Sequence, residues 1–150
     1  KQIKLLEEAA QRLYKEWFVD LRFPGHENTN IIDGVPEGWE KKSIGEIGTV
    51  ITGKTPSTSN KENYGGSIPF ITIPDMHTGS YPVSSVFLSE KGAESQSKKY
   101  IPQGALIVSC IGTAGLVCIT KERCQTNQQI NSLILDDKKC YTTCISFSCH

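Results

Sequence analysis

Apolar residues recur with the spacing of a helix over the first part of the chain. They step by three or four residues and occupy Ile3, Leu6, Ala10, Leu13 and Trp17. This is the a/d spacing of a coiled-coil seam, in which apolar side chains keep facing one partner helix. Pro24 and Gly25 follow and favour a break in the helix. The pattern predicts a helix over residues 1–23 that packs either on its own domain or against a partner helix.

After residue 40 the apolar runs become shorter and are typical of β-strands. They cover residues 49–52, 68–73, 105–111, 114–120 and 130–135. Gly112 and Thr113 separate two of these runs and predict a hairpin-like turn. Ser43 and Glu46 have the spacing of a capping box, and Ser89 predicts the N-cap of a helix that extends to about residue 96.

The order of these elements predicts an α+β fold, with a small mixed or antiparallel sheet and a long N-terminal helix that forms a coiled coil. We expect a spacing or dimerisation helix at residues 1–23, a connector at residues 24–40 and a globular domain at residues 41–150. Asp33 and Gly34 predict a turn in the connector. No apolar stretch is long enough to span a membrane, so we expect no membrane association.

The formal net charge of the chain is zero, but the charge is unevenly distributed. Residues 1–48 hold seven Lys/Arg and nine Asp/Glu, a net of −2, whereas residues 49–135 hold seven and five, a net of +2. A domain with so few cations is expected to bind any nucleic acid weakly by itself, because each neutralised phosphate adds only about 0.9 to the salt slope. Useful affinity for such a polyanion would require a larger assembly.

All six cysteines lie in the last 41 residues. Four soft ligands near the end are Cys140, Cys144, Cys149 and His150. Their spacing lacks the usual C-x2-C pair, and the adjacent Cys149 and His150 would strain a shared tetrahedron. We therefore predict no metal site.

Motifs for catalysis are also weak. The chain has no glycine-rich phosphate loop and no dinucleotide fingerprint. Pro74-Asp75 with Asp136-Asp137-Lys138 fits the loose pattern of metal-dependent nucleases, in which carboxylates hold Mg²⁺. The gap of about sixty residues is long, and such short patterns arise by chance. The sequence predicts no catalytic activity and no cofactor.

Several segments, taken in order, resemble the specificity subunit of type I restriction–modification systems. The resemblance begins with EEAAQRLYKEWFVDLRFPGHE, DGVPEGWE and IGEIGTVITGKTPST. It continues with GGSIPFITIPDM, YIPQGALIVSCIGTAGLVCI and TNQQINSLI, and so covers about residues 1–135. The first segment resembles the long conserved helix of that family, and the next two resemble the entry into a target-recognition domain. The cysteine-rich tail departs from the family pattern, which continues with helical, aromatic-rich sequence.

This resemblance implies a non-catalytic protein that reads double-stranded DNA. A full subunit carries two recognition domains, each reading one half of a split target, and two helices packed antiparallel as a ruler. It directs the modification (methyltransferase) subunit and, indirectly, the restriction subunit, in the cytoplasm. Only one helix and one domain are recognisable, and the only methionine is Met76. We therefore expect a fragment or a half-subunit, which would pair with a second copy through its exposed helix.

Candidate DNA contacts are polar and basic residues on predicted loops and helix ends. They are Lys54, Thr55, Ser57, Thr58, Ser59, Asn60, Lys61, Tyr64, His77, Lys98, Lys99 and Arg123. The loop at residues 54–61 has a second interpretation as an ordinary solvated loop. Asn127 and Gln128 belong to an element shared by the family, so we favour a structural role for them. An alternative for the whole chain is an interaction scaffold, or a silent or decayed half-subunit, that reads no DNA.

Overall fold

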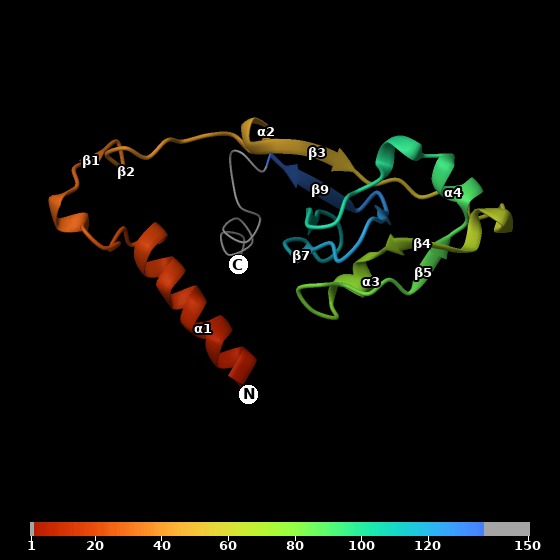
Figure 1. The fold of residues 1–150 in the computed structure, drawn as a ribbon, viewed down its shortest axis with the longest axis horizontal. Coiled ribbons are helices and arrows are strands. Elements are labelled where there is room, and N and C mark those ends of the chain that lie inside the picture. Colours follow the sequence, from red (N-terminus) through yellow and green to blue (C-terminus); the bar gives the residue numbers. More distant parts are fainter. Residues whose placement is uncertain (1, 137–150) are drawn as a thin grey trace. The chain divides into compact units, whose positions relative to one another are not determined.

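The computed structural model describes residues 2–136, and Figure 1 shows their fold. The chain divides into two compact units, Lys1–Ser43 and Ile44–His150. Two predictions concern residues outside the described part: the metal-ligand candidates Cys140, Cys144, Cys149 and His150, and the Asp137-Lys138 half of the nuclease pattern. The side chain of Ile3 is likewise outside it.

The N-terminal unit begins with helix α1 (Gln2–Tyr14), which continues as one π-helical turn, η1 (Lys15–Val19). The helical segment therefore ends at Val19, and the predicted extent of residues 1–23 is wrong. The N–H of Asp20 donates to the carbonyl oxygen of Lys15, five residues earlier, and Leu21 adopts a positive φ of 55°. A left-handed residue cannot continue a right-handed helix, so the chain turns away before Pro24 is reached.

An aromatic cluster forms the packed part of this unit. The ring of Phe18 stacks on Tyr14 with centroids 5.0 Å apart, and it lies 5.6 Å from the ring of Trp39. Phe23 also contacts Trp39, with ring centroids 5.3 Å apart. After the short 3₁₀ turn η2 (His26–Asn28), strands β1 (Ile31–Ile32) and β2 (Val35–Pro36) pair as a hairpin. The predicted turn at Asp33 and Gly34 connects them, with positive φ at both residues.

The C-terminal unit contains an antiparallel sheet of four strands in the order β3-β9-β6-β7. Its strands are β3 (Gly48–Thr52), β6 (Leu106–Ser109), β7 (Val117–Ile119) and β9 (Ile130–Leu135). The one-turn helix α2 (Ile44–Ile47) leads directly into β3, as the capping-box spacing predicts. In Figure 1, β3 and β9 lie side by side along their whole length, in agreement with their five paired positions.

A second sheet has three strands in the order β5-β4-β8. Strand β4 (Tyr64–Ile71) pairs antiparallel with β5 (Val86–Leu88) and parallel with β8 (Gln125–Thr126). Short helices connect the strands: α3 (Ile73–Met76), α4 (Glu90–Glu94), and the 3₁₀ turns η3 (Lys61–Asn63) and η4 (Ser97–Lys99). The fold is therefore α+β with largely antiparallel sheets, as predicted.

The main core lies between these sheets. It contains Ile71, Met76, Ile101, Ala105, Ile107, Cys118, Cys124 and Ile130. Burial raises the pKa of the Cys118 thiol to about 11. Burial, followed by the nearby Glu122 carboxylate, raises the pKa of Cys124 to about 12. Both cysteines are thus neutral packing residues at physiological pH. The other face of the four-stranded sheet holds a smaller cluster of Leu106, Val117 and Leu133.

Two element predictions can be compared with the structure in detail. The predicted strand at residues 68–73 is wrong at its end: it stops at Ile71, because Thr72 caps helix α3 and Ile73 and Pro74 lie inside that helix. Pro74 fits an early helical position since its missing N–H is not needed there. The helix predicted after Ser89 is confirmed: the Ser89 hydroxyl accepts from the N–H of Gly92, and α4 ends at Glu94.

Candidate nucleic-acid interface

Three connecting segments of the C-terminal unit meet at one end of the four-stranded sheet. Thr52, the last residue of β3, pairs with Asn131 near the start of β9, and Asn131 also pairs with Val108 near the end of β6. The segment after β3, the segment before β9 and the β6–β7 connection therefore project from the same end. These segments are residues 53–60, 127–129 and 110–116. We call this region the sheet-end loops.

The first of these loops is anchored to the segment before β9 through its backbone. The N–H of Gly53 donates to the carbonyl oxygen of Ile130, and the N–H of Lys54 donates to that of Thr126 at 2.9 Å. A Cβ on Gly53 would overlap the backbone oxygens of Thr126 and Asn127, so only glycine fits this close approach. The Thr55 hydroxyl then donates to the Gln128 side-chain oxygen. These contacts fix the start of the loop and leave the Lys54 side chain exposed.

The rest of this loop is held from inside. The Asn63 side chain donates to the carbonyl oxygen of Ser57 at 2.9 Å, and the Tyr64 hydroxyl donates to that of Pro56 at 2.8 Å. Asn60 caps η3 by accepting from the N–H of Glu62. The tip at residues 57–60 remains exposed, with the hydroxyls of Ser57 and Ser59 2.8 Å apart. The loop thus presents hydroxyl and amide groups from an anchored backbone.

Candidate residues in this loop have different environments. Lys54, Ser57, Thr58, Ser59, Asn60 and Lys61 are exposed, while Thr55 and Tyr64 are half-buried. Burial raises the pKa of the Tyr64 hydroxyl, which donates within the loop. Lys61 lies in η3 next to Glu62, whose carboxylate pairs with Lys91 on α4. The hydrogen bond and charge of Lys91 lower the pKa of Glu62.

The Asn127 side chain has a local structural role. Its oxygen accepts from the backbone N–H of Gln129 at 3.1 Å, and its amide nitrogen donates to the Gln129 side-chain oxygen at 3.2 Å. Its backbone N–H donates to the carbonyl oxygen of Ile71 on the neighbouring sheet. These contacts agree with the predicted role of tying loop backbone together.

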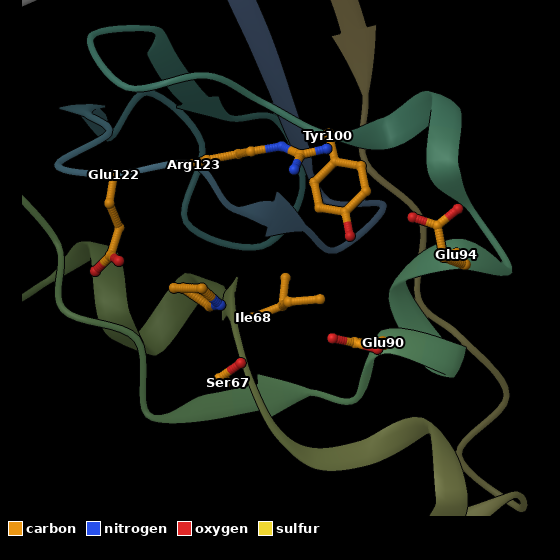
Figure 2. Close-up of a pocket in the computed structure, with 8 residues that line it drawn as sticks. Ser67, Ile68, Glu90, Glu94, Tyr100, Glu122 and Arg123 are labelled. Carbon is orange, nitrogen blue, oxygen red and sulfur yellow. The ribbon is translucent and has the colours of Figure 1, made fainter.

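Arg123 lines a cavity of about 430 Å³ that includes no residue of the sheet-end loops. Its guanidinium stacks over the Tyr100 ring, 3.6 Å from the centroid. Figure 2 shows Arg123 across the ring from the carboxylates of Glu90 and Glu94, which lie on α4. Glu122 completes a lining with three carboxylates and one guanidinium. This lining disfavours a phosphate, because the carboxylates repel it more than one cation attracts it.

Three further candidates lie outside the sheet-end loops in the sequence. His77 is the exposed C-cap of α3, and the segment after it contacts β7 through a hydrogen bond from the Ile119 N–H to the carbonyl oxygen of Ser80. Lys98 is exposed and Lys99 half-buried in η4, directly before Tyr100. The fold therefore groups Lys98 and Lys99 with Arg123 rather than with Lys54.

Asp75, the first carboxylate of the nuclease pattern, has a structural role. Only 3% of the residue is exposed. One carboxylate oxygen accepts from the N–H and hydroxyl of Thr72, both at 2.8 Å, and the other from the N–H of Ser85 at 3.0 Å. Burial acts to raise the pKa of Asp75, but the hydrogen bonds from Ser85 and Thr72 outweigh it and hold the pKa below its ordinary value. The carboxylate caps α3 and joins it to the segment before β5.

The predicted helix seam is exposed in part. Leu6 is 71% and Leu13 46% exposed, whereas Ala10 and Trp17 are half-buried. Trp17 lies in the π-helical turn, which has more residues per turn than α1 and so shifts its phase relative to Leu6 and Leu13. Leu5, at 59% exposed, lies with Ala9 and Leu13 along a shallow groove on the same helix. The exposed apolar surface of α1 therefore includes Leu5, which the a/d spacing omits.

The described helices include none that is both long and apolar enough to cross a membrane. The fold brings the hydroxyl and amide side chains within residues 55–60 and 127–129, together with the exposed Lys54, to one end of the four-stranded sheet. Residues 36–149 match the type I restriction modification DNA specificity domain, and the chain belongs to this family. The curated relatives of this chain are named as specificity subunits of type I restriction enzymes.

Two curated relatives are specificity subunits. The chain is 54% identical over 106 residues to that of the type I restriction enzyme HindI from Haemophilus influenzae. It is 35% identical over 109 residues to that of MjaIX from Methanocaldococcus jannaschii. These matches cover 70% and 71% of the chain but only 23% and 25% of the relatives. The chain thus spans about a quarter of the length of these relatives.

Solved structures share the fold. The HsdS subunit from Thermoanaerobacter tengcongensis matches with a TM-score of 0.64 at 19% identity, over 99% of this chain and 36% of that one. A chain from a structure of a type I R-M system matches with a TM-score of 0.65, also at 19% identity and with the same coverage. At this identity the likeness concerns the fold alone.

Proposed function

We propose that the C-terminal unit reads one half of a bipartite double-stranded DNA target. It thereby directs the modification (methyltransferase) subunit, and through it the restriction subunit, of a type I restriction–modification complex. Family membership supports DNA recognition, and the observation that carries the proposal is the anchored loop at residues 54–61. Its backbone is fixed on both sides, while its lysines and polar tip stay exposed.

The chemistry of this loop matches the two tasks of a DNA-reading element. Exposed Lys54 and Lys61 would position the unit on phosphates, while the hydroxyls and amides between them would face base edges. Anchoring matters because a loop that is already ordered loses less conformational entropy on binding. The Arg123 cavity holds three carboxylates and one guanidinium, so we assign the phosphate contacts to Lys54 and Lys61 first.

The N-terminal helix would serve a separate role, in assembly and in spacing the recognition domains. Exposed Leu5, Leu6 and Leu13 offer an apolar stripe to a helix of a partner. We propose that this stripe sets the distance to a second recognition domain, in a longer chain or in a second copy, and helps to seat the modification subunit. Such a complex would act where the DNA is, in the cytoplasm.

The test measures DNA binding by the full specificity subunit containing this chain, assembled with its modification subunit. Duplexes selected from a randomised pool should share a half-site motif. Lys54→Ala with Lys61→Ala should weaken binding to all sequences and reduce the salt slope by about 0.9 for each phosphate that is no longer neutralised. Lys15→Ala is the matched control, because this lysine pairs with Asp20 in the N-terminal unit. A complex that assembles but selects no motif would favour the scaffold alternative.

A further inference from the structure

Two consecutive glutamines at the sheet end accept hydrogen bonds through their side-chain oxygens, while their side-chain nitrogens have no partner in the part of the chain that the structure describes. The Gln129 oxygen accepts from the Asn127 amide nitrogen at 3.2 Å. Asn127 is itself oriented, because its oxygen accepts from the Gln129 backbone N–H. The network therefore assigns which end of the Gln129 amide is oxygen and which is nitrogen.

Gln128 is held in a parallel way by the neighbouring loop. Its side-chain oxygen accepts from the Thr55 hydroxyl, a contact between residues 73 positions apart. The backbone bond from Lys54 to Thr126 keeps the two segments together beside this contact. Gln128 is exposed, so the contact with Thr55 holds its side chain beside this loop while its amide stays open to a ligand.

Neither Gln128 Nε2 nor Gln129 Nε2 has a hydrogen-bond partner among the described residues. The buried polar atoms without a partner in this part of the chain are Gln96 Oε1, Thr126 Oγ1 and Ser132 Oγ. The two glutamine nitrogens are therefore not sealed in the interior. Gly112 in the β6–β7 connection lies beside this place, since a Cβ there would make an ordinary contact of 3.9 Å with Gln129 Nε2. The donors of both amides thus face accessible space at the end of the sheet.

An unrestrained glutamine usually reads adenine, by accepting from N6 and donating to N7. Here the oxygen of each amide already accepts one hydrogen bond and keeps one lone pair, whereas both N–H donors of its nitrogen are without a partner among the described residues. Adjacent donors match a base edge that presents acceptors, namely O6 and N7 of guanine or O4 of thymine in the major groove.

We propose that Gln128 and Gln129 are specificity-determining donors that read an acceptor-bearing base, guanine or thymine, in the half-site, with Thr55 and Asn127 as the positioning residues. This inference rests on the proposed function and adds the chemistry by which the bases are read. It also changes the role expected for Gln128, which the shared family element had indicated to be structural.

The experiment compares the half-site motifs selected by the full specificity subunit and its Gln128→Glu and Gln129→Glu variants, each assembled with the modification subunit. Glutamate has the same shape but only acceptors, so the preference at one position should shift from guanine or thymine towards cytosine or adenine. The expected change in discrimination there is about tenfold. Gln103→Glu is the charge-matched control: Gln103 is exposed, precedes β6 and has no partner among the described residues.

Thr55→Val provides a second, milder variant that keeps the shape of the side chain. It removes only the hydroxyl that orients Gln128, so it should reduce the discrimination at that position without reversing it. If the glutamate variants keep the wild-type motif, or lose affinity equally for all sequences, the glutamines do not read bases. If the wild-type complex selects no motif at all, the proposed function itself fails, and the two failures are thereby distinguished.

Discussion

The side-chain nitrogen of Gln96 donates to the side-chain oxygen of Gln125 at 2.7 Å, and both residues are almost completely buried. The Gln125 nitrogen in turn donates to the carbonyl oxygen of Ala93 at 3.0 Å. This pair connects β8 to the end of α4. It therefore holds the segment that carries Arg123 and places the start of the 127–129 connection, although it touches neither the sheet-end loops nor any predicted DNA contact.

Gln125→Leu should destabilise the C-terminal unit while leaving base preference unchanged. The variant removes both hydrogen-bonding groups of Gln125 and leaves the side-chain nitrogen of Gln96 buried without its partner, while the Ala93 oxygen keeps only the bond from the Gln96 backbone N–H. The expected loss is about 1–3 kcal/mol in the free energy of unfolding. Urea unfolding measures it, with Gln103→Leu as an exposed control. Unchanged stability would mean that water replaces the missing hydrogen bonds.

Gly53→Ala should be destabilising although alanine adds only a methyl group. Its Cβ would overlap backbone oxygens of the 126–127 segment, which cannot move without breaking the pairing of β4 with β8. We expect a loss of about 1–3 kcal/mol, as for other overpacked sites, and weaker DNA binding as the start of the 54–61 loop shifts. Gly45→Ala in α2 is the control, since a Cβ there meets nothing within 4 Å. Equal stability of the two variants would contradict the predicted close contact.

Asp75→Asn should destabilise the fold in a pH-dependent way. Folding lowers the pKa of Asp75, so the unfolded chain binds its proton at a higher pH than the folded chain does. The stabilisation is complete above the ordinary pKa of 3.8 and is lost as the pH falls through the lower folded-state value. The variant should therefore lose about 1.5–3 kcal/mol at neutral pH, and the loss should shrink as the pH falls below 3.8. If the free energies of unfolding of the two proteins in urea differ by the same amount at every pH, the effect comes from packing and not from the charge of Asp75.

Leu6→Asp with Leu13→Asp should abolish association through α1. These leucines are exposed, and the charged side chains would be buried without partners in a helix pair. We expect light scattering to show an oligomer of the unaltered chain at high concentration and a monomer of the variant. Gln11→Asp, at another exposed position of α1, is the control. If the unaltered chain is a strict monomer, it does not self-associate through α1, and the apolar stripe would contact only a different subunit.

The sequence by itself determined the local elements. Strands β3 and β9 and the Ser89-capped helix α4 appear where apolar runs and capping spacing predict them. These signals act over a few neighbouring residues, so one sequence carries them in full. The early end of the N-terminal helix was missed because it depends on the backbone conformation of Leu21, a residue with no strong turn preference.

Only the tertiary structure decided which distant residues share a site. Thr55 and Gln128 meet because β3 and β9 pair antiparallel, whereas Arg123 lies against Tyr100 and lines a cavity with three glutamates. Strand pairing joins residues far apart in the sequence, and short strands such as β8 have too few residues to show a period. The sequence therefore identified the polar groups, and the pairing of strands determined which of them lie together.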